Sequence, residues 1–546
     1  MINKNLIKVV SIFLLEICFA HGAISQVSEV WQADQGDGTY LNPILHADYS
    51  DPDVVRVGGD FYMTASSFNA VPGLPILHSK DLANWKLIGH ALQSLPPEDH
   101  FSKPQHGNGV WAPAIRYHEG EYYIYWGDPD FGIFVVKTKD PSGPWEAPIL
   151  VEAGKGLIDP CPLWDEDGKA YLSHAYAGSR AGIKSILVVK PMNWEGTKTL
   201  GSGKLVFDGH ESHPTVEGTK FYKRNGFYYI FAPAGGVSTG WQLILKSKSP
   251  YGPYEEHIAL AQGNTEINGP HQGAWVDLEN GDDWFIHFQD KDAYGRIAHL
   301  QPMVWNGDWP TIGEDIEGQG TGQPVMRHKK PNIGKEYAVA TPLDSDEFDG
   351  DDIGLQWQWH ANPKATWAFP NPSKSQLRLF TDRIPDDAKN LWGVPNLLLQ
   401  KFPAEEFVTT TSLTFTPNEK LIEEKVGLVV MGMSYGYIGL ESQKDGIYLH
   451  YVKCIDAENG KPEEKKVIKK LDGNQVQLRV IVGKDAVCEF SYSEDGSKFT
   501  KINDTFKATP GKWIGAKVGL FALRNSQIND SGYVDIDWFR FGKRVD

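Results

Sequence analysis

Three acidic residues stand at the starts of strand-like segments that are far apart in the sequence. Asp51 opens DPDVVRVGGDFYMTAS, Asp159 opens DPCPLWDEDGKAYLSHA and Glu217 opens EGTKFYKRNGFYYIFAP. Carboxyl groups that share a pocket can divide acid and base roles, because close negative charges raise the pKa of one of them. Hydrolysis of glycosidic bonds uses such a set: one protonated carboxyl group expels the leaving group and one carboxylate activates water. The segments indicate this chemistry if the fold brings their starts together.

The three segments belong to a fivefold internal repeat. Each repeat has an apolar strand, a glycine-containing turn such as Asn225-Gly226, and an aromatic strand; the other two begin at Trp111 and His271. These turns are β-hairpin signals. The repeat starts are 60, 48, 58 and 54 residues apart, and a period near 50 with short strands is typical of a β-propeller. We predict five blades; an ordinary β-sandwich with chance hairpins is the alternative.

The propeller geometry predicts where the acidic residues meet. The first strand of each hairpin is expected beside the central axis, so that the strand starts gather at one mouth of the channel. Asp51, Asp159 and Glu217 are expected at equivalent places around that mouth. Asp53 has no counterpart in the other repeats, and strand alternation points it in another direction. We expect Asp53 at a turn or strand edge, with no catalytic role.

Residues 1–25 have the pattern of a secretory signal peptide. Lys4 and Lys8 precede an apolar run over 9–20, and small residues follow at 23–25. The apolar run is too short to span a membrane, and no later segment is long and apolar enough. Cys18 follows an isoleucine, which makes a poor acylation site. A periplasmic protein is therefore favoured over a lipid-anchored one.

The pattern changes after residue 330. Residues 331–342 are polar and punctuated by proline and glycine, which is typical of a linker. Residues 343–546 contain strand-like runs such as VGLVVMGM, GIYLHYVKC and YVDIDWFRFG and little helical periodicity. The predicted fold is thus all-β: a five-bladed β-propeller over 26–330, followed by a concanavalin-like β-sandwich.

Composition excludes some classes of partner. The 546 residues are 41% hydrophobic, 12% aromatic and 23% charged, with a net charge of −17 and no basic block. Nucleic acid is disfavoured, because its phosphates require clustered Lys and Arg. Apart from Cys18, the cysteines are Cys161, Cys454 and Cys488. They form no disulfide framework and no zinc spacing; Cys454 and Cys488 could pair, but buried thiols are the favoured interpretation.

Several segments, taken in order, resemble glycoside hydrolase family 43. They are NPILHADYSDPDVVRVGGDFYMTASSF, PILHSKDLANWKLIGHAL, GVWAPAIRYHEGEYYIYW, IDPCPLWDEDGKAYL, TVEGTKFYKRNGFYYIFAPAGG and YGRIAHLQPMVW. The resemblance covers about residues 40–310. The C-terminal part, from DEFDGDDIGLQWQW to YVDIDWFRFG, is similar to the sandwich of the β-xylosidase/α-L-arabinofuranosidase branch.

The resemblance implies a role for each matching acid. Asp51 matches the general base, Glu217 matches the general acid, and Asp159 matches the residue that tunes the pKa of the acid and orients the others. The family inverts the anomeric configuration, so the acid and base carboxyl groups are expected ~6.5–9.5 Å apart. No cofactor is required for this chemistry, although calcium with a structural role fits the resemblance.

Three further residues match positions that line the channel in relatives. Trp111 matches a tryptophan that contacts the sugar, with core packing as the alternative. Arg296 matches an arginine that contacts sugar hydroxyls, with a surface ion pair as the alternative. His271 matches a histidine that contacts a central metal, often calcium, or water, with a purely structural role as the alternative. His271 is thus the metal-ligand candidate of the channel; the acid-rich segment 344–352 could also hold calcium, but solvated turns are favoured there.

The implied function is that of an exo-acting glycosidase on an oligosaccharide substrate. Release of terminal α-L-arabinofuranose from hemicellulose oligosaccharides, such as those of xyloglucan or arabinoxylan, is favoured, with β-D-xylosidase as the alternative. Two other hypotheses stay open: a retaining five-bladed hydrolase of fructans, whose carboxyl groups would be ~5–5.5 Å apart, and a glycan-binding propeller without catalysis.

Overall fold

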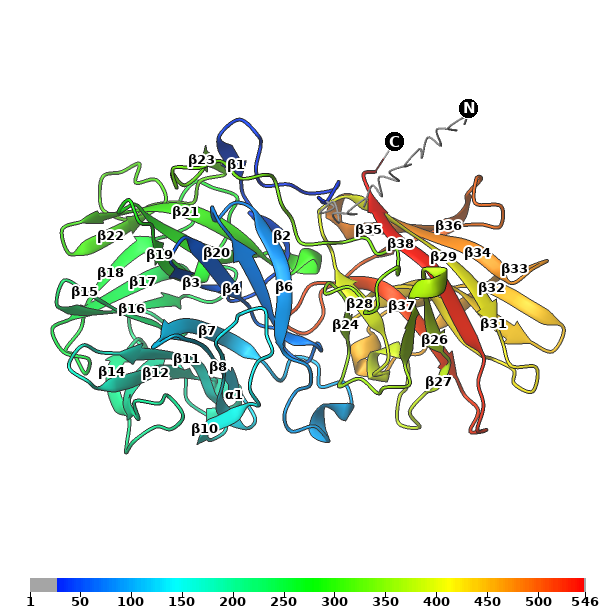
Figure 1. The fold of residues 1–546 in the computed structure, drawn as a ribbon, viewed down its shortest axis with the longest axis horizontal. Coiled ribbons are helices and arrows are strands. Elements are labelled where there is room, and N and C mark those ends of the chain that lie inside the picture. Colours follow the sequence, from blue (N-terminus) through cyan, green and yellow to red (C-terminus); the bar gives the residue numbers. More distant parts are fainter. Residues whose placement is uncertain (1–26, 545–546) are drawn as a thin grey trace, which may run out of the picture.

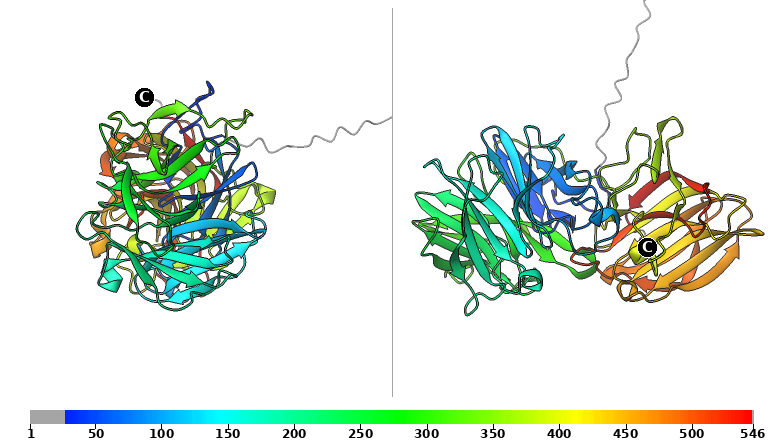
Figure 2. Two further views of the ribbon diagram at one scale, coloured as in Figure 1. Left: turned by 90° about the vertical axis from the view of Figure 1, so that its left-hand side faces the viewer. Right: turned by 90° about the horizontal axis from the view of Figure 1, so that it is seen from below.

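Two all-β domains make up residues 27–544, the part of the chain that the computed structural model describes. The propeller lies at the left of Figure 1 and the sandwich at the right, and Figure 2 shows the same pair from the side and from below. No helix within residues 27–544 is long and apolar enough to cross a membrane. The predicted signal peptide falls on residues outside the described range.

The propeller has five blades, as predicted; blades 1–4 are antiparallel sheets of four strands, and blade 5 has a fifth strand. Blade 1 contains β3 (Asp53–Val57), β4 (Asp60–Thr64), β5 (Gly73–Ser79) and β6 (Trp85–Leu92). Blade 2 contains β7 (Trp111–His118), β8 (Glu121–Asp128), β9 (Gly132–Thr138) and β10 (Ile149–Ala153). Blade 3 contains β11 (Leu157–Trp164), β12 (Ala170–Tyr176), β13 (Ile186–Met192) and β14 (Lys204–Asp208).

Blade 4 contains β15 (Lys220–Arg224), β16 (Phe227–Ala234), β17 (Trp241–Ser247) and β18 (Glu255–Leu260). Blade 5 contains β19 (His271–Asp277), β20 (Asp283–Asp290), β21 (Arg296–Asn306) and β2 (Leu45–Asp48), with β22 (Trp309–Ile312) paired to β21. Because β2 precedes blade 1 in the chain, its pairing with β21 closes the ring. The short pieces between strands are η1 (His100–Ser102), α1 (Gly178–Ala181) and η2 (Asp292–Tyr294).

The first strand of each hairpin lies innermost: β3 contacts β7 and β19, β11 contacts β7 and β15, and β19 contacts blade 4 through β16 and β17. Strand alternation sends one face of each blade into the apolar layer shared with its neighbour. Trp85, for example, is buried in the layer between blades 1 and 5 together with Phe61 and Trp284. Trp85 therefore packs the blade and takes no part in the channel.

The sandwich packs two sheets on an apolar core, in agreement with the predicted concanavalin-like fold. One sheet contains β24 (Gln358–Trp359), β28 (Leu398–Lys401), β37 (Lys517–Arg524), β30 (Lys425–Met431), β31 (Tyr435–Gln443), β32 (Gly446–Cys454) and β33 (Glu464–Lys470), with β27 (Asp382–Arg383) paired to β37. The other contains β25 (Ala368–Asn371), β26 (Gln376–Phe380), β38 (Tyr533–Gly542), β29 (Phe407–Thr416), β34 (Gln475–Val482), β35 (Val487–Ser493) and β36 (Thr500–Lys507). The remaining 3₁₀ turns are η3 (Pro372–Lys374), η4 (Leu391–Gly393), η5 (Ala457–Asn459) and η6 (Lys484–Ala486).

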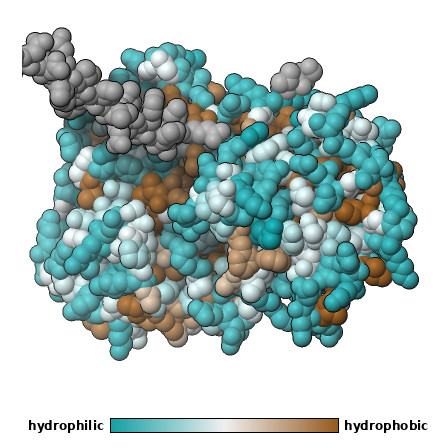
Figure 3. All heavy atoms as spheres, turned by 45° about the vertical axis from the view of Figure 1, so that its right-hand side comes forward, coloured by the Kyte–Doolittle hydropathy of each residue, from teal (hydrophilic) through white to brown (hydrophobic). Residues whose placement is uncertain are grey.

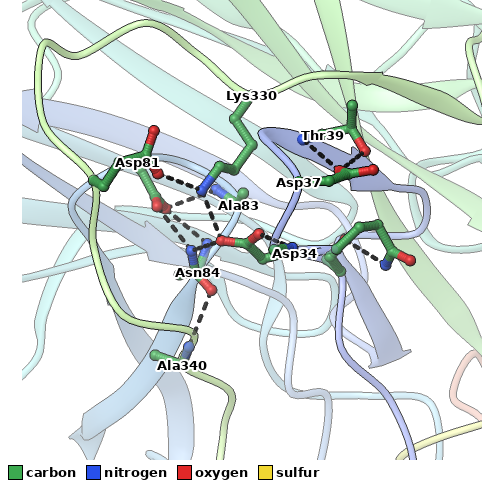
Figure 4. A network of polar contacts seen from close by, with 12 residues as sticks. Asp34, Asp37, Thr39, Asp81, Ala83, Asn84, Lys330 and Ala340 are labelled. Carbon is green, nitrogen blue, oxygen red and sulfur yellow. Dashed lines mark hydrogen bonds and ion pairs between the residues drawn. The ribbon is translucent and has the colours of Figure 1, made fainter.

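The segment between the domains is tied to the propeller by a buried polar network (Figure 4). Lys330, just after β23 (Arg327–Lys329), donates to Asp34 at 2.8 Å. Asn84 donates to Asp34 and also accepts from the backbone N–H of Ala340 at 3.0 Å. β23 also pairs with β1 (Thr39–Leu41). These contacts hold the connecting segment against blade 1, so the approach of the chain to the sandwich is fixed.

Cys161, Cys454 and Cys488 are free and buried, in agreement with the interpretation as core thiols. The surface visible in Figure 3 is mostly hydrophilic, with apolar residues in small separate patches.

Asp53 departs from the prediction of a turn or strand-edge residue. It begins β3, its side chain has no exposed surface, and its carboxylate accepts from Ile115 N–H and Arg116 Nη1, both at 2.7 Å. Asp53 therefore joins blade 1 to blade 2. A buried carboxylate needs such partners, because an unpaired charge away from water is costly.

Candidate active site

One left-handed residue marks the mouth end of every inner strand. These residues are Asp51, Ala112, Asp159, Gly218 and Gln272, with φ between 38° and 64°. Each interrupts strand alternation near the axis, and the ladders of blades 2, 3 and 5 shift register at this point. Asp tolerates positive φ better than most residues, so aspartate can serve both as the left-handed residue and as a buried carboxylate.

The position of the left-handed residue in each inner strand corrects one detail of the predicted site. Asp51 and Asp159 are themselves left-handed residues and occupy equivalent places in blades 1 and 3. Glu217 comes one residue before Gly218, so its place corresponds to those of Trp111 and His271. The three acids therefore share a mouth without being strictly equivalent, and Glu217 is the one that reaches from a different register.

Asp51 is held by a dense set of donors. Its side chain is almost fully buried, and its Oδ2 accepts from Ser50 Oγ at 2.7 Å and from Ser66 Oγ at 2.6 Å. Arg296 Nη1 lies 3.4 Å from Asp51 Oδ1 and also donates to Ser50 Oγ at 2.9 Å. These contacts fix the orientation of the Asp51 carboxyl group at the pocket.

Asp159 is also buried, and it is tied to the next blade. Its Oδ2 accepts from the backbone N–H of Gly218 at 2.7 Å, and its carbonyl oxygen accepts from Thr219 Oγ1 at 2.9 Å. Burial, and next the neighbouring Glu217, raise the pKa of Asp159 well above its usual range. Asp159 is therefore a carboxyl group that holds its proton more firmly than an exposed aspartate does, as expected when two carboxyl groups lie close together.

Glu217 is the most accessible of the three acids. About a third of its side chain is exposed, and His271 Nε2 lies 3.5 Å from its Oε1. Its backbone N–H donates to Pro233 O at 3.1 Å, which fixes the chain just before β15. An acid that can exchange its proton with a bound ligand must reach the cavity, and Glu217 does.

A single pocket of about 350 Å³ collects these groups. Its lining includes Asp51, Asp159, Glu217, Arg296, Phe68 and Trp111. His271 is not among the lining residues, because it is 1% exposed and lies behind Glu217. Of the six residues predicted for the site, the pocket thus presents five directly and the sixth through Glu217. Its size is in the range of small-molecule sites.

The sandwich contributes one residue that the sequence did not reveal. Trp513, in the loop before β37, lines the same pocket; its ring centroid lies 6.3 Å from that of Trp111, and the Arg296 guanidinium lies 5.5 Å from its centre. Gly511 and Gly515 mark a turn around Trp513, but a turn signal does not tell which neighbouring domain the turn will touch. The pocket is complete only when both domains are present.

The donor set around His271 does not form a metal cluster. Within residues 27–544, no three His, Cys, Asp or Glu side chains lie close enough together to hold an ion. Neither ring nitrogen of His271 has a hydrogen-bond partner, and Glu217 is its one ion-pair neighbour. The residues around His271 therefore do not fit a metal that is held by protein ligands alone.

Comparison with known proteins agrees with this geometry. The model for glycosyl hydrolases family 43 matches residues 40–310, and that for the beta xylosidase C-terminal concanavalin A-like domain matches residues 345–542. The chain belongs to glycosyl hydrolase family 43. The family 43 match spans the propeller and contains all six predicted site residues.

Relatives of this family 43 chain extend over almost its whole length. It is 37% identical to a putative beta-xylosidase of Xylanibacter ruminicola, over 89% of this chain and 86% of that protein. It is 29% identical to a non-reducing end alpha-L-arabinofuranosidase of Bacteroides ovatus, over 92% and 94%. Among solved structures, GH43B of the Bacteroides ovatus xyloglucan PUL superposes with a TM-score of 0.80 at 26% identity, covering 93% of this chain and 100% of that one.

Proposed function

We propose that this glycoside hydrolase releases one terminal pentose at a time from hemicellulose oligosaccharides, with inversion at the anomeric carbon. The observation that carries the proposal is the single pocket in which Asp51, Asp159 and Glu217 converge beside Trp111 and Trp513. Such a pocket admits one chain end and not the middle of a chain.

We infer a role for each acid from its surroundings. Asp51, held in place by Ser50, Ser66 and Arg296, removes a proton from water as the water attacks the anomeric carbon. Glu217, which reaches the cavity, donates its proton to the departing oxygen as the glycosidic bond breaks. Asp159, whose pKa is raised by burial and by Glu217, holds a proton next to the general acid.

The identity of the pentose is the finer part of the proposal. The sequence alone favours α-L-arabinofuranose, but the Xylanibacter ruminicola relative and a 33% identical protein of Formosa agariphila are both named as beta-xylosidases. We therefore rank β-D-xylose first and keep α-L-arabinofuranose second, because the Bacteroides ovatus relative carries that activity in its name. Xyloglucan and arabinoxylan oligosaccharides stay the proposed substrates, and the periplasm, reached through residues 1–25, the proposed location.

A paired assay tests the choice of sugar. Purified enzyme is given 4-nitrophenyl β-D-xyloside and 4-nitrophenyl α-L-arabinofuranoside, and kcat/KM is compared. We expect the xyloside to be preferred; a strong preference for the arabinofuranoside would reverse the order. The anomer that forms first, followed by proton NMR, tests inversion, and a product with retained configuration would favour the retaining alternative.

Replacement of Glu217 by Gln tests the acid. Nitrophenolate departs easily without a proton, whereas a sugar alcohol does not. We expect kcat/KM to fall about 10²–10⁴-fold on xylobiose and less on the nitrophenyl glycoside. Equal losses on both substrates, or no loss on either, would contradict the assignment of Glu217 as the general acid and would revive the non-catalytic alternative if the parent enzyme were also inactive.

A further inference from the structure

A small cavity lies at the contact between the two domains. It has a volume of about 70 Å³, and none of its described lining residues belongs to the catalytic pocket. Its wall includes residues of β2 and β6 in the propeller and of β24 and β28 in the sandwich, which lie on the two sides of the boundary in Figure 1. We call it the interdomain cavity and define it by Tyr49, His90, Gln358 and Lys401.

Two lysine residues of the sandwich face each other beside this cavity. Lys401 ends β28 and Lys517 begins β37, and the two are directly opposite in the antiparallel pairing of these strands. Side chains at such positions point to the same side of a sheet, and like charges there repel each other. Lys401 lines the interdomain cavity, and Lys517 lies behind its wall, where its Nζ donates to Gln358 Oε1 at 3.0 Å. The strand register therefore brings two ammonium groups together at the domain contact.

Neither lysine forms an ion pair with any residue within 27–544. Lys401 Nζ donates to the carbonyl oxygen of Asp48 at 2.6 Å and lies 4.6 Å from the centre of the Tyr49 ring. The Asp48 carboxylate accepts instead from two backbone groups, Arg296 N–H at 2.8 Å and Gly515 N–H at 3.1 Å. Since an ammonium group has three donors, each lysine keeps two that no described residue accepts.

His90 adds a buried ring to the same wall. It is 7% exposed, and its Nδ1 is a buried atom with no hydrogen-bond partner among the described residues. The carboxylate that lines the interdomain cavity, that of Asp344, is occupied by Ser28 Oγ at 2.6 Å and Ser345 Oγ at 2.9 Å. The cavity thus presents hydrogen-bond donors and positive charge without a matching negative charge.

We propose that the interdomain cavity binds one small monovalent anion, such as chloride, held by Lys401 and His90 in front of Lys517. The site takes no part in the proposed glycosidase reaction, and the inference does not depend on that function. A water molecule takes up about 30 Å³, so a volume of about 70 Å³ fits an ion of this size and not a sugar. Much of the wall is apolar, with Leu45 and Pro75 among its residues, and charges attract each other more strongly away from water.

The energetics favour an anion at this place. The two lysines lose their water when the chain folds, whether or not an anion is bound, so an anion has to offset only its own desolvation. Burial, and next Lys401, lower the pKa of Lys517 to about 7, and a negative charge beside both lysines acts against this loss of the proton. An anion that binds only when the two domains are folded and in contact stabilises the folded protein by mass action.

Thermal unfolding at pH 7 tests the proposal. Chloride is varied from about 1 mM to about 0.5 M while sodium gluconate, whose anion is too large for the cavity, keeps the ionic strength constant. We expect the melting temperature to rise by about 3 °C for each tenfold increase in chloride above its dissociation constant. Formate should replace chloride. A melting temperature that does not change when chloride replaces gluconate would overturn the proposal and would leave water as the occupant.

Lys401→Met removes the charge and keeps most of the side chain. We expect it to abolish the chloride dependence, and the melting temperature in gluconate should stay level or rise because the repulsion between the lysines is gone. Lys507→Met is the matched control, since it makes the same change at an exposed lysine on β36, and it should keep the full dependence. Equal chloride dependence in Lys401→Met and the parent would contradict the site.

A crystal of the parent protein grown in sodium bromide gives a direct measurement that does not rely on a variant. We expect an anomalous scattering peak in the interdomain cavity within hydrogen-bond distance of Lys401 Nζ. A cavity that contains only water under these conditions would refute the proposal, even if Lys401→Met failed to fold.

Discussion

Beneath the carboxyl groups of the candidate site lies a second layer of charge. Lys220 on β15 is 1% exposed and donates to the carbonyl oxygen of Pro113 on β7 at 2.7 Å. Blades 2 and 4 are not neighbours, so the lysine side chain crosses the axis of the propeller. Arg116 lies in the same layer, paired with Asp53 and donating to Cys161 Sγ at 2.9 Å. Lys220 is thus a buried cation that acts on Asp159, whereas the charge of Arg116 is paired with Asp53.

Lys220→Met is predicted to shift the pH dependence of catalysis. The Lys220 charge opposes the rise in the pKa of Asp159 that burial and Glu217 cause. Without it the pKa of Asp159 rises further, so the limb of the kcat/KM profile that reports loss of this proton should move toward higher pH. Lys220→Arg keeps the charge and is expected to keep the profile. A loss of stability in Lys220→Met with an unmoved profile would mean that Lys220 only joins the blades.

The sequence was sufficient to predict that Asp51, Asp159 and Glu217 meet, because the repeat itself carries that information. It was not sufficient to place Glu217 one residue out of register or to pair Asp53 with Arg116. Both depend on backbone conformation and on hydrogen bonds between blades, and neither leaves a periodic trace in the chain. Asp-Pro before a strand has the same appearance whether its carboxylate faces the channel or a neighbouring blade.

At the scale of elements, the hairpins and the ring were predictable, and the loop over the pocket was not. Turn pairs such as Asn225-Gly226 determine hairpins locally, and five hairpins with a common period require a ring. The loop around Trp513 depends instead on contacts with Asp48 and Ala293, which lie more than 200 residues away in the chain. A local pattern cannot encode such a contact.

Trp513→Gly is predicted to separate stability from activity. Glycine accepts the φ of 64° that tryptophan adopts under strain, so the midpoint of thermal unfolding should stay level or rise, by an amount equivalent to about 1 kcal/mol. Loss of the ring beside Trp111 and Arg296 should lower kcat/KM about tenfold or more on every substrate. A parallel fall of the melting temperature and activity would show that Trp513 is mainly structural. Lys507→Ala, which changes an exposed lysine on β36 of the same domain, is the control variant.

At the scale of the whole molecule, the contact between the domains contains buried basic groups that are held neutral. Burial lowers the pKa of His90 to about 3 and that of His106 to about 4, and lowers the pKa of His360 well below its usual range. His106 stacks on Trp392 of the sandwich with ring centroids 3.5 Å apart. Burial, and next Lys401, lower the pKa of Lys517 to about 7. The folded contact between the domains therefore disfavours protonation of these three histidines and of Lys517.

These groups predict a loss of stability as the pH falls from about 6.5. In the unfolded chain histidine has a pKa of about 6.5, so between that value and about 4 the unfolded state binds more protons than the folded one. Stability then falls with falling pH by up to about 1.4 kcal/mol per unit for each such histidine. Lys517 acts in the same direction above pH 7. Raising the pH toward about 10.5, the ordinary pKa of lysine, removes the free-energy cost of keeping this buried amine neutral.

Thermal unfolding at pH 7, 6 and 5 would measure the effect. The melting temperature should fall over this range, and calorimetry in two buffers of different ionisation enthalpy should show protons taken up on unfolding. Carboxylates with lowered pKa values, such as Asp504 at about 2, release their contribution only at more acidic pH. Asp128 acts against the histidines in this window, because burial raises its pKa to about 7 and the folded state then binds its proton more readily than the unfolded one. His90→Gln, which removes one titrating group, should flatten the slope. An equal melting temperature at pH 7 and pH 5 would show that these histidines do not govern the union of the two domains.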